Sequence, residues 1–173
     1  KISWLFILSV TAVNLILLLA SGKLLNLFYP ISYLGLAILL YNFAPNLYIG
    51  QVWWMWFLSP LVRRLADYQS GFTEPSLILL APYLVSLVVL PTIIVKIPFF
   101  QNSQKNHFIM PFAAILYGTV LGLMTRSSIA VLIAFIDWTS PILFSLYLYT
   151  RWKEYPEISR LTLRIFLWGS LVM

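Results

Sequence analysis

The chain has 173 residues, of which 61% are hydrophobic and only 9% are charged, and its formal net charge is +6. Soluble domains carry about a quarter charged residues, so this composition excludes a soluble domain and is typical of an integral membrane protein. The positive charges fall in short segments between apolar runs, where they influence membrane topology and contact lipid headgroups. We expect no nucleic-acid-binding function.

The length and the apolar runs predict an all-α, polytopic membrane protein with about seven spans, because one span needs about 20 apolar residues. We predict a single transmembrane helical domain over residues 1–173 with short loops. The predicted spans cover residues 2–20, 24–42, 47–62, 75–97, 108–124, 129–149 and 161–173. The chain opens on Lys1 and stops at Met173 inside an apolar run, so we expect a truncated last span and a longer parent chain.

The first two spans are separated only by the short sequence Ser21–Lys23. A connection of this length predicts an antiparallel hairpin. The second span contains Pro30 and Gly35, which membrane helices tolerate when neighbouring helices cover the disturbed backbone.

The third apolar segment, residues 47–62, is ambiguous because its length suits either a complete span or a segment that dips into the membrane and returns. We predict a spanning helix that is disturbed at Pro60, where a backbone hydrogen bond is lost. A turn-rich surface segment with Gln69, Ser70 and Gly71 is expected to follow.

Aromatic and charged side chains are most concentrated between Gln51 and Pro75. Tryptophan prefers the level of the lipid headgroups, so this concentration predicts a membrane surface. The predicted interfacial aromatics are Trp53, Trp54 and Trp56.

Arg63 and Arg64 follow these aromatics and are candidates for binding phosphate, because a guanidinium group matches phosphate oxygens bidentately. Asp67 is a candidate for the same site. The alternative is an ordinary arginine pair held by Asp67, Glu74 or lipid headgroups.

The fourth span contains Pro82 and Pro91, whose spacing predicts a kinked or broken helix. Its start is favourable, because Pro75 suits a first helical turn and Glu74 complements the positive end of the helix dipole. Lys96–His107 is predicted as the longest polar connection.

The fifth and sixth spans carry the small and polar residues of the C-terminal half. Gly118 and Gly122 have the spacing that allows two membrane helices to approach closely. Asp137 is the intramembrane polar candidate, because an acid at this depth costs about 2.5 to 3.5 kcal/mol on insertion scales. The alternative is a structural cap on a second half-helix that begins near Pro141.

The last predicted span follows a charged interfacial loop, Arg151–Arg160, and Arg164 is expected to snorkel from its first turn. With seven spans, six basic residues fall on the side of the N-terminus and four on the other side, which favours a cytoplasmic N-terminus. The first set is Lys1, Lys96, Lys105, Arg151, Lys153 and Arg160, and the second is Lys23, Arg63, Arg64 and Arg126. A re-entrant third segment would reverse this orientation.

Metal and cofactor sites are not expected. The chain has no cysteine and one histidine, and it lacks nucleotide-binding, zinc-protease and serine-hydrolase motifs.

Four segments resemble the N-terminal half of bacterial O-antigen ligase and O-antigen polymerase-like membrane proteins, with a cyanobacterial character. They read WFLSPLVRRLADYQSGF, PSLILLAPYLV, ILYGTVLGL and IDWTSPILFSLYLYTRWKEYP. The resemblance begins near Trp53 and covers most of the remaining chain. It implies a metal-independent glycosyltransferase in a bacterial cytoplasmic or thylakoid membrane.

Such a protein would act on polysaccharide linked to polyprenyl pyrophosphate, at the outer face of the cytoplasmic membrane. The resemblance implies Arg63 and Arg64 as phosphate partners, with Asp67 or Asp137 as orienting acids. The catalytic loop of this family lies in its C-terminal half, so no catalytic residue is assigned here. The alternative hypothesis is a non-catalytic accessory subunit of a larger photosynthetic or respiratory membrane complex.

Overall fold

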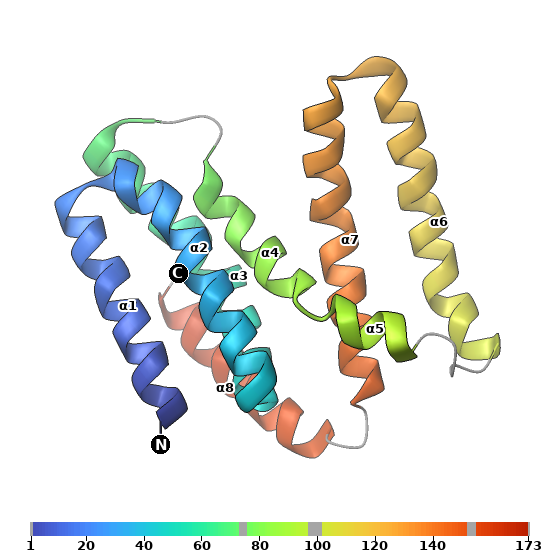
Figure 1. The fold of residues 1–173 in the computed structure, drawn as a ribbon, viewed down its shortest axis with the longest axis horizontal. Coiled ribbons are helices and arrows are strands. Elements are labelled where there is room, and N and C mark those ends of the chain that lie inside the picture. Colours follow the sequence, from blue (N-terminus) through green and yellow to red (C-terminus); the bar gives the residue numbers. More distant parts are fainter. Residues whose placement is uncertain (1, 73–75, 97–101, 152–154, 173) are drawn as a thin grey trace. The chain divides into compact units, whose positions relative to one another are not determined.

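The computed structural model describes residues 2–72, 76–96, 102–151 and 155–172. These ranges are almost entirely helical and contain no strand, which confirms the all-α prediction (Figure 1). The helices are α1 (Ile2–Ala20), α2 (Gly22–Phe43), α3 (Pro45–Ser70), η1 (Leu77–Leu80), α4 (Ala81–Leu87), α5 (Leu90–Lys96), α6 (Asn102–Thr125), α7 (Ser128–Thr150) and α8 (Tyr155–Val172).

By length and composition, four helical segments in the described part are suited to cross a membrane. They are Gly22–Phe43, Leu77–Lys96, Phe108–Thr125 and Ser128–Thr150, and Leu5–Ala20 is a shorter apolar helix. Four long apolar helices are consistent with an integral membrane protein and match the seven predicted spans in part. The helices α3 and α8 also cover predicted spans, but they are not among these four.

The helices form two compact units, which are described separately. Unit 1 comprises Lys1–Val88 and Lys153–Met173, and unit 2 comprises Val89–Trp152. Unit 1 therefore contains α1 to α4 and α8, and unit 2 contains α5, α6 and α7.

The predicted hairpin of the first two spans is present as α1 and α2. Ser21 caps the N-terminus of α2, and its hydroxyl accepts a hydrogen bond from the Leu24 amide at 3.5 Å. Farther from the turn, the Asn14 side-chain amide donates to the Ser32 hydroxyl at 2.9 Å and joins the two helices. Asn14 also donates to the Val10 carbonyl at 2.8 Å, and the Ser32 hydroxyl donates to the Tyr29 carbonyl at 3.1 Å, so the pair links two side chains that are also bonded within their own helices.

The third helix is longer than predicted. It runs unbroken through Pro60 and ends at Ser70. Gly71 caps its C-terminus with a φ of 81°, a conformation that favours glycine. The prediction of a turn-rich segment after Val62 is therefore wrong, because these residues are helical as far as Ser70. The helix also does not reverse its direction, as the re-entrant alternative requires. Proline removes only one helical hydrogen bond. The neighbouring Ser59 is fully buried, and its hydroxyl lies 3.4 Å from that of Tyr29 on α2.

The predicted break in the fourth span is confirmed. The chain forms η1, α4 and α5 in succession, and Pro82 and Pro91 each occupy the second position of a new helix. Proline is favourable there because the first helical amides have no partner within the helix. Glu74, Pro75 and residues 97–101 lie outside the described residues.

Unit 2 is built around the α6–α7 hairpin, whose turn contains Arg126 and Ser127 (Figure 1). α6 begins at Asn102, so the second half of the predicted polar connection is helical. α7 continues through Pro141 without interruption, which overturns the alternative of a helix break near Pro141 with Asp137 as the cap of a second half-helix. Gly122 faces α7, where an added Cβ would lie 3.3 Å from a Val131 methyl group.

The core of unit 1 lies where α2, α3, η1 and α4 meet. Tyr48 is fully buried, and its hydroxyl donates to the Val85 carbonyl at 2.9 Å. Tyr29 is buried as well, and its hydroxyl lies 3.4 Å from that of Ser59. The large side chains with less than 2% exposure in this core include Leu25, Leu36, Leu40, Ile49, Val52, Met55 and Ile78.

Helix α8 packs along α3 in the same direction. As α3 advances from Gly50 to Phe57, the neighbouring residues on α8 advance from Leu161 to Gly169. The two glycines allow this close approach, because an added Cβ would lie 3.2 Å from Ile165 at Gly50 and 2.9 Å from the Phe57 ring at Gly169. Part of the predicted loop Arg151–Arg160 is helical, since α8 begins at Tyr155.

Candidate functional site

A groove of about 480 Å³ lies within unit 1 between α1, α2, α3 and α8, and we refer to it as the unit 1 groove. Most of its lining is apolar or aromatic. The polar or charged side chains that reach it come from four different helices: Thr11 of α1, Tyr33 of α2, Gln51 of α3 and Arg164 of α8. A mostly apolar pocket with a few convergent polar groups is the usual form of a small-molecule site.

Gln51 is the most deeply placed of these polar groups, with 7% of its surface exposed. Its side-chain amide donates to the Tyr33 carbonyl at 3.0 Å, which fixes the side chain between α2 and α3. Its Oε1 atom is buried and has no hydrogen-bond partner in the described part of the chain. A buried acceptor without a partner costs about 1 to 3 kcal/mol, so a ligand hydroxyl at this atom would be favourable.

Arg164 supplies the positive charge of the unit 1 groove. It was expected in the first turn of the last span, but α8 begins at Tyr155, so Arg164 lies in the middle of the helix. Among the side chains that the structure describes, it forms no ion pair. Its side chain is exposed, and α8 is not among the four helices suited to cross a membrane, so the charge is accessible to an anionic ligand.

The close packing of α8 on α3 explains how Arg164 comes near Gln51. Gly50 precedes Gln51 on α3, and α8 approaches it through Leu161 and Ile165. Arg164 immediately precedes Ile165, so the contact at Gly50 sets its position over the groove. A larger residue at position 50 would push α8 away from α3 and would separate the Arg164 guanidinium from the Gln51 side-chain amide.

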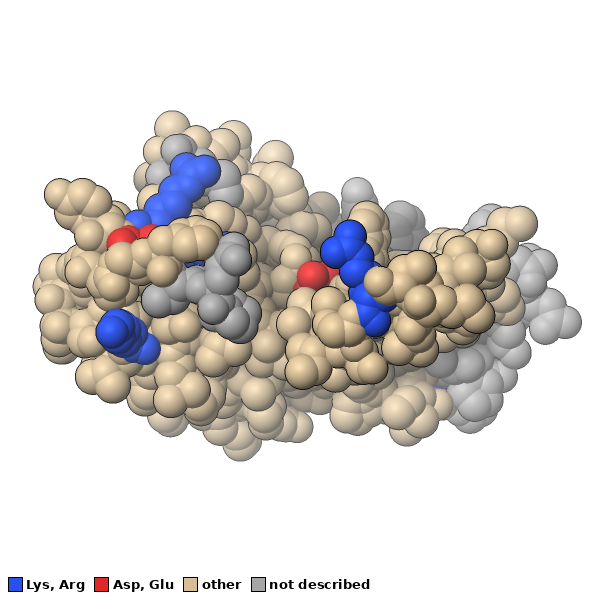
Figure 2. All heavy atoms as spheres, turned by 90° about the horizontal axis from the view of Figure 1, so that it is seen from above, with Lys and Arg blue, Asp and Glu red and all other residues tan. Residues whose placement is uncertain are grey.

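The predicted phosphate candidates do not line this groove. Arg63 and Asp67 form an ion pair within α3, with 3.4 Å between Nε and Oδ2, and the Arg63 guanidinium lies 5.4 Å from the centre of the Phe72 ring. Arg64 is exposed. The surface seen in Figure 2 is mostly uncharged, and its basic and acidic side chains form only small groups.

The three predicted interfacial tryptophans point to different neighbours. Trp53 contacts Phe166 of α8 edge-on, with 5.1 Å between the ring centres. Trp56 contacts Tyr83 of α4 in the same way at 4.9 Å. Only Trp54 lines the unit 1 groove, so the structure does not bring the three indoles together at one site.

Asp137 belongs to unit 2, whereas Arg63, Arg64 and the unit 1 groove belong to unit 1. Its Oδ1 atom is buried without a hydrogen-bond partner in the described ranges. No group of acidic, histidine or cysteine side chains suited to a metal ion occurs among the residues that the structure describes.

The sequence analysis did not single out Thr11, Tyr33 or Gln51, and it interpreted Arg164 as a snorkelling residue. The sequence did contain a signal for the site, because Gln51 and Arg164 are polar residues within segments that otherwise have the composition of membrane spans. Their convergence could not be read from the sequence, because they are separated by more than 100 residues.

In comparisons with known proteins, no family model, curated protein or solved structure matches the chain.

Proposed function

We propose that this chain is the membrane part of a transferase or polymerase that acts on glycan linked to polyprenyl pyrophosphate, at the outer face of the cytoplasmic membrane. The observation that supports it is the unit 1 groove, where mostly apolar and aromatic walls adjoin Arg164, an exposed cation without an acidic partner among the described side chains. A polyprenyl-linked glycan has the matching parts, which are an apolar chain, phosphate groups and sugar hydroxyls.

Each part of this ligand class has a complement in the groove. The polyprenyl chain would lie against apolar walls such as Leu58 and Trp168. Arg164 would donate to phosphate oxygens, and hydrogen bonds of this charged kind contribute about 1.5 to 3 kcal/mol. The buried Oε1 of Gln51 would accept a hydrogen bond from a sugar hydroxyl. Arg164 is therefore assigned to phosphate binding and not to bond cleavage.

The direct test is binding of undecaprenyl pyrophosphate to the purified protein in detergent, measured by native mass spectrometry and compared with undecaprenol. We expect the phosphorylated lipid to bind at least tenfold more tightly. Arg164→Gln should weaken its binding about 10- to 100-fold by removing the charge, and should leave undecaprenol binding unchanged.

Arg160→Gln is the matched control, because Arg160 is exposed one turn earlier on α8 and does not line the groove. It should retain wild-type binding. Equal affinity for the pyrophosphate and the alcohol would contradict the proposal. So would equal losses in Arg160→Gln and Arg164→Gln, which would indicate general attraction of an anion to a basic helix.

The accessory-subunit hypothesis is favoured by a different observation. None of the residues in the apolar span Phe108–Thr125 is buried, so α6 offers a long surface to lipid or to another membrane protein. Stoichiometric copurification with other subunits, together with no binding of the pyrophosphate lipid, would support this second function over the first.

A further inference from the structure

The α6–α7 hairpin of unit 2 carries a second groove, of about 570 Å³, which we refer to as the hairpin groove. Its floor is made of small residues that recur every fourth position on both helices. They are Ala114, Gly118 and Gly122 on α6 and Ala130 and Ala134 on α7. This spacing places each set on one face of its helix, so the floor is a continuous apolar channel along the hairpin.

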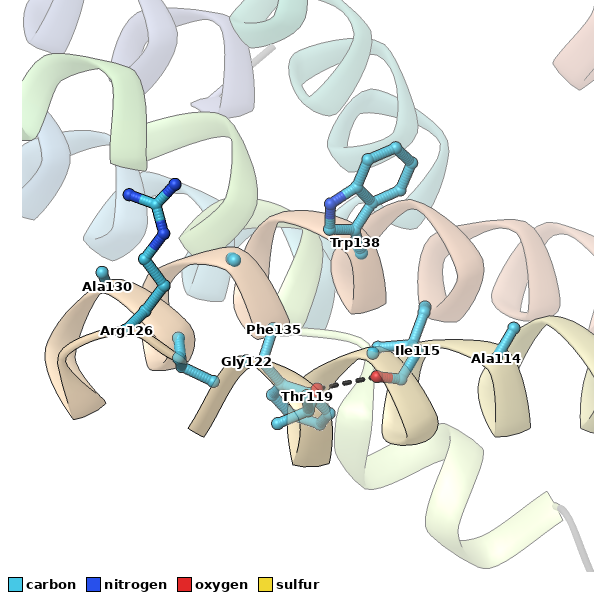
Figure 3. A pocket seen from close by; sticks show the side chains of 11 residues that line it. Ala114, Ile115, Thr119, Gly122, Arg126, Ala130, Phe135 and Trp138 are labelled. Atoms are coloured by element: carbon cyan, nitrogen blue, oxygen red, sulfur yellow. Dashed lines mark hydrogen bonds between the residues drawn. The ribbon is translucent and has the colours of Figure 1, made fainter. Parts of the chain in front are cut away.

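The two ends of the hairpin groove differ in chemistry (Figure 3). Arg126 lies at the turn between the helices, is exposed, and forms no ion pair within the described part of the chain. Trp138 lies farther along α7 with 70% of its surface exposed. The turn also holds the N-terminal end of α7, whose partial positive charge adds to that of Arg126.

The length of the groove corresponds to one leaflet of a bilayer. Arg126 follows Ala114 by twelve residues, which corresponds to about 18 Å along a helix. The hydrocarbon core of a bilayer is about 30 Å thick, so one leaflet contributes about 15 Å. With Arg126 at the headgroup level, the small-residue floor ends near the middle of the membrane.

We propose that the hairpin groove binds an anionic phospholipid, with the phosphate at Arg126 and one acyl chain on the small-residue floor. The charge at the surface end, the apolar floor and the one-leaflet length all match this ligand. A helix from a second copy would fit the small residues as well, but α6 has no acidic residue and α7 has only Asp137 to meet the Arg126 charge. This inference is independent of the proposed binding of a lipid-linked glycan in unit 1.

The test uses phosphatidylglycerol and phosphatidylcholine that carry the same photoreactive diazirine in one acyl chain. Each lipid is added at equal, low concentration to the protein in phosphatidylcholine nanodiscs, and the labelled peptides are mapped by mass spectrometry. We expect the anionic lipid to label the groove residues about fivefold more than the zwitterionic lipid. This ratio corresponds to the attraction of about 1 kcal/mol that one basic residue near a membrane surface exerts on anionic lipid.

Two variants separate the contributions of charge and shape. Arg126→Gln should reduce labelling by phosphatidylglycerol to the level of phosphatidylcholine. Gly118→Leu should reduce labelling of the groove by both lipids at least fivefold, because its side chain would fill the channel. An added Cβ at Gly118 has no neighbour within 4 Å, so this change is compatible with folding.

Each variant has a matched control. Lys96→Gln removes an exposed positive charge elsewhere in unit 2, and Gly35→Leu adds the same side chain at a helical glycine of unit 1 that is equally open. Both should label like the wild type.

Equal labelling by the two lipids, or full labelling of Arg126→Gln, would overturn the proposal. A wild-type dimer in detergent that Gly118→Leu converts to a monomer would also overturn it and would assign the groove to a second copy of the chain.

Discussion

Units 1 and 2 are both built from apolar helices, but the buried share of the residues differs between α2 of unit 1 and α6 of unit 2. In α2 of unit 1, 39% of the apolar span is buried, whereas in the Phe108–Thr125 span of unit 2 no residue is buried. Unit 1 also has polar links between helices, such as the one from Gln51 to the Tyr33 carbonyl. In unit 2, the hydroxyls of Thr119 and Ser140 donate to carbonyls one turn earlier in their own helices.

The difference shows that hydropathy does not separate an apolar helix that is packed within its unit from one whose surface stays exposed. Lipid tails are as apolar as leucine, so apolar side chains alone give little preference for a protein neighbour. Close glycine contacts and polar links between helices provide that preference. They are frequent where α2, α3 and α8 meet, so we expect changes in this region to have the largest effects on stability.

The largest effect is expected for Gly22→Ala at the start of α2. An added Cβ would lie 2.7 Å from the Ala66 carbonyl and 2.6 Å from the Ser70 hydroxyl of α3. Because one of these atoms is backbone, the helices must separate, and overpacking of this kind costs about 1 to 3 kcal/mol. The measurement is unfolding by sodium dodecyl sulfate in mixed micelles, followed by circular dichroism.

Gly35→Ala is the control for this prediction, because an added Cβ there has no neighbour within 4 Å. Alanine is more favourable than glycine in a helix by about 0.5 to 1 kcal/mol, so this variant should be slightly more stable than the wild type. A loss of stability at both positions would mean that the close contact at Gly22 is not the cause.

Tyr48→Phe should have the next largest effect, a loss of about 1 kcal/mol. The change removes the hydroxyl that donates to the Val85 carbonyl and leaves this carbonyl with the longer bond from the Val88 amide, at 3.4 Å. The same unfolding titration measures it. Tyr68→Phe, at a side chain that is 90% exposed, should change stability by less than about 0.5 kcal/mol, and similar effects of the two changes would contradict the assigned hydrogen bond.

Gly122→Ala tests whether the helix contact in unit 2 is more tolerant than that in unit 1. Its Cβ would meet a Val131 methyl group at 3.3 Å, and a side chain of this kind adjusts more easily than backbone. The gain in helix propensity offsets most of the strain, so we expect a change within about 1 kcal/mol, smaller than that of Gly22→Ala. A larger loss at Gly122 would show that unit 2 is the more tightly packed unit.

The smallest effect is expected for Arg63→Gln. The Arg63–Asp67 pair is partly exposed on α3, and pairs of this type contribute about 0.3 to 0.5 kcal/mol. The difference from wild type should disappear when the titration is repeated at high salt, because salt screens exposed charges. A loss above 1 kcal/mol that persists in salt would indicate a structural role for Arg63 beyond this pair.

The sequence was most informative where a local feature has a local cause. The Ser21–Lys23 connection is too short for anything but a hairpin, and Pro82 and Pro91 lie where α4 and α5 begin. The same reasoning failed at Pro60 and Pro141, which lie inside unbroken helices. The loss of one backbone hydrogen bond is small enough for the surrounding structure to outweigh it.

The candidate site was less predictable than the fold. Arg63, Arg64 and Asp67 are conspicuous in the sequence because they are adjacent, but two of them neutralise each other within α3. Arg164 and Gln51 are inconspicuous because each stands alone in an apolar segment. Their proximity depends on the glycine contacts that bring α8 onto α3.

Composition and periodicity by themselves determined that this protein is all-helical and mostly apolar, because these properties depend on each segment alone. The tertiary structure decided which helices are packed, where α3 ends, and which polar groups share the unit 1 groove. The physical reason is that a helix satisfies its backbone hydrogen bonds internally, whereas contacts between helices join side chains that lie far apart in the sequence.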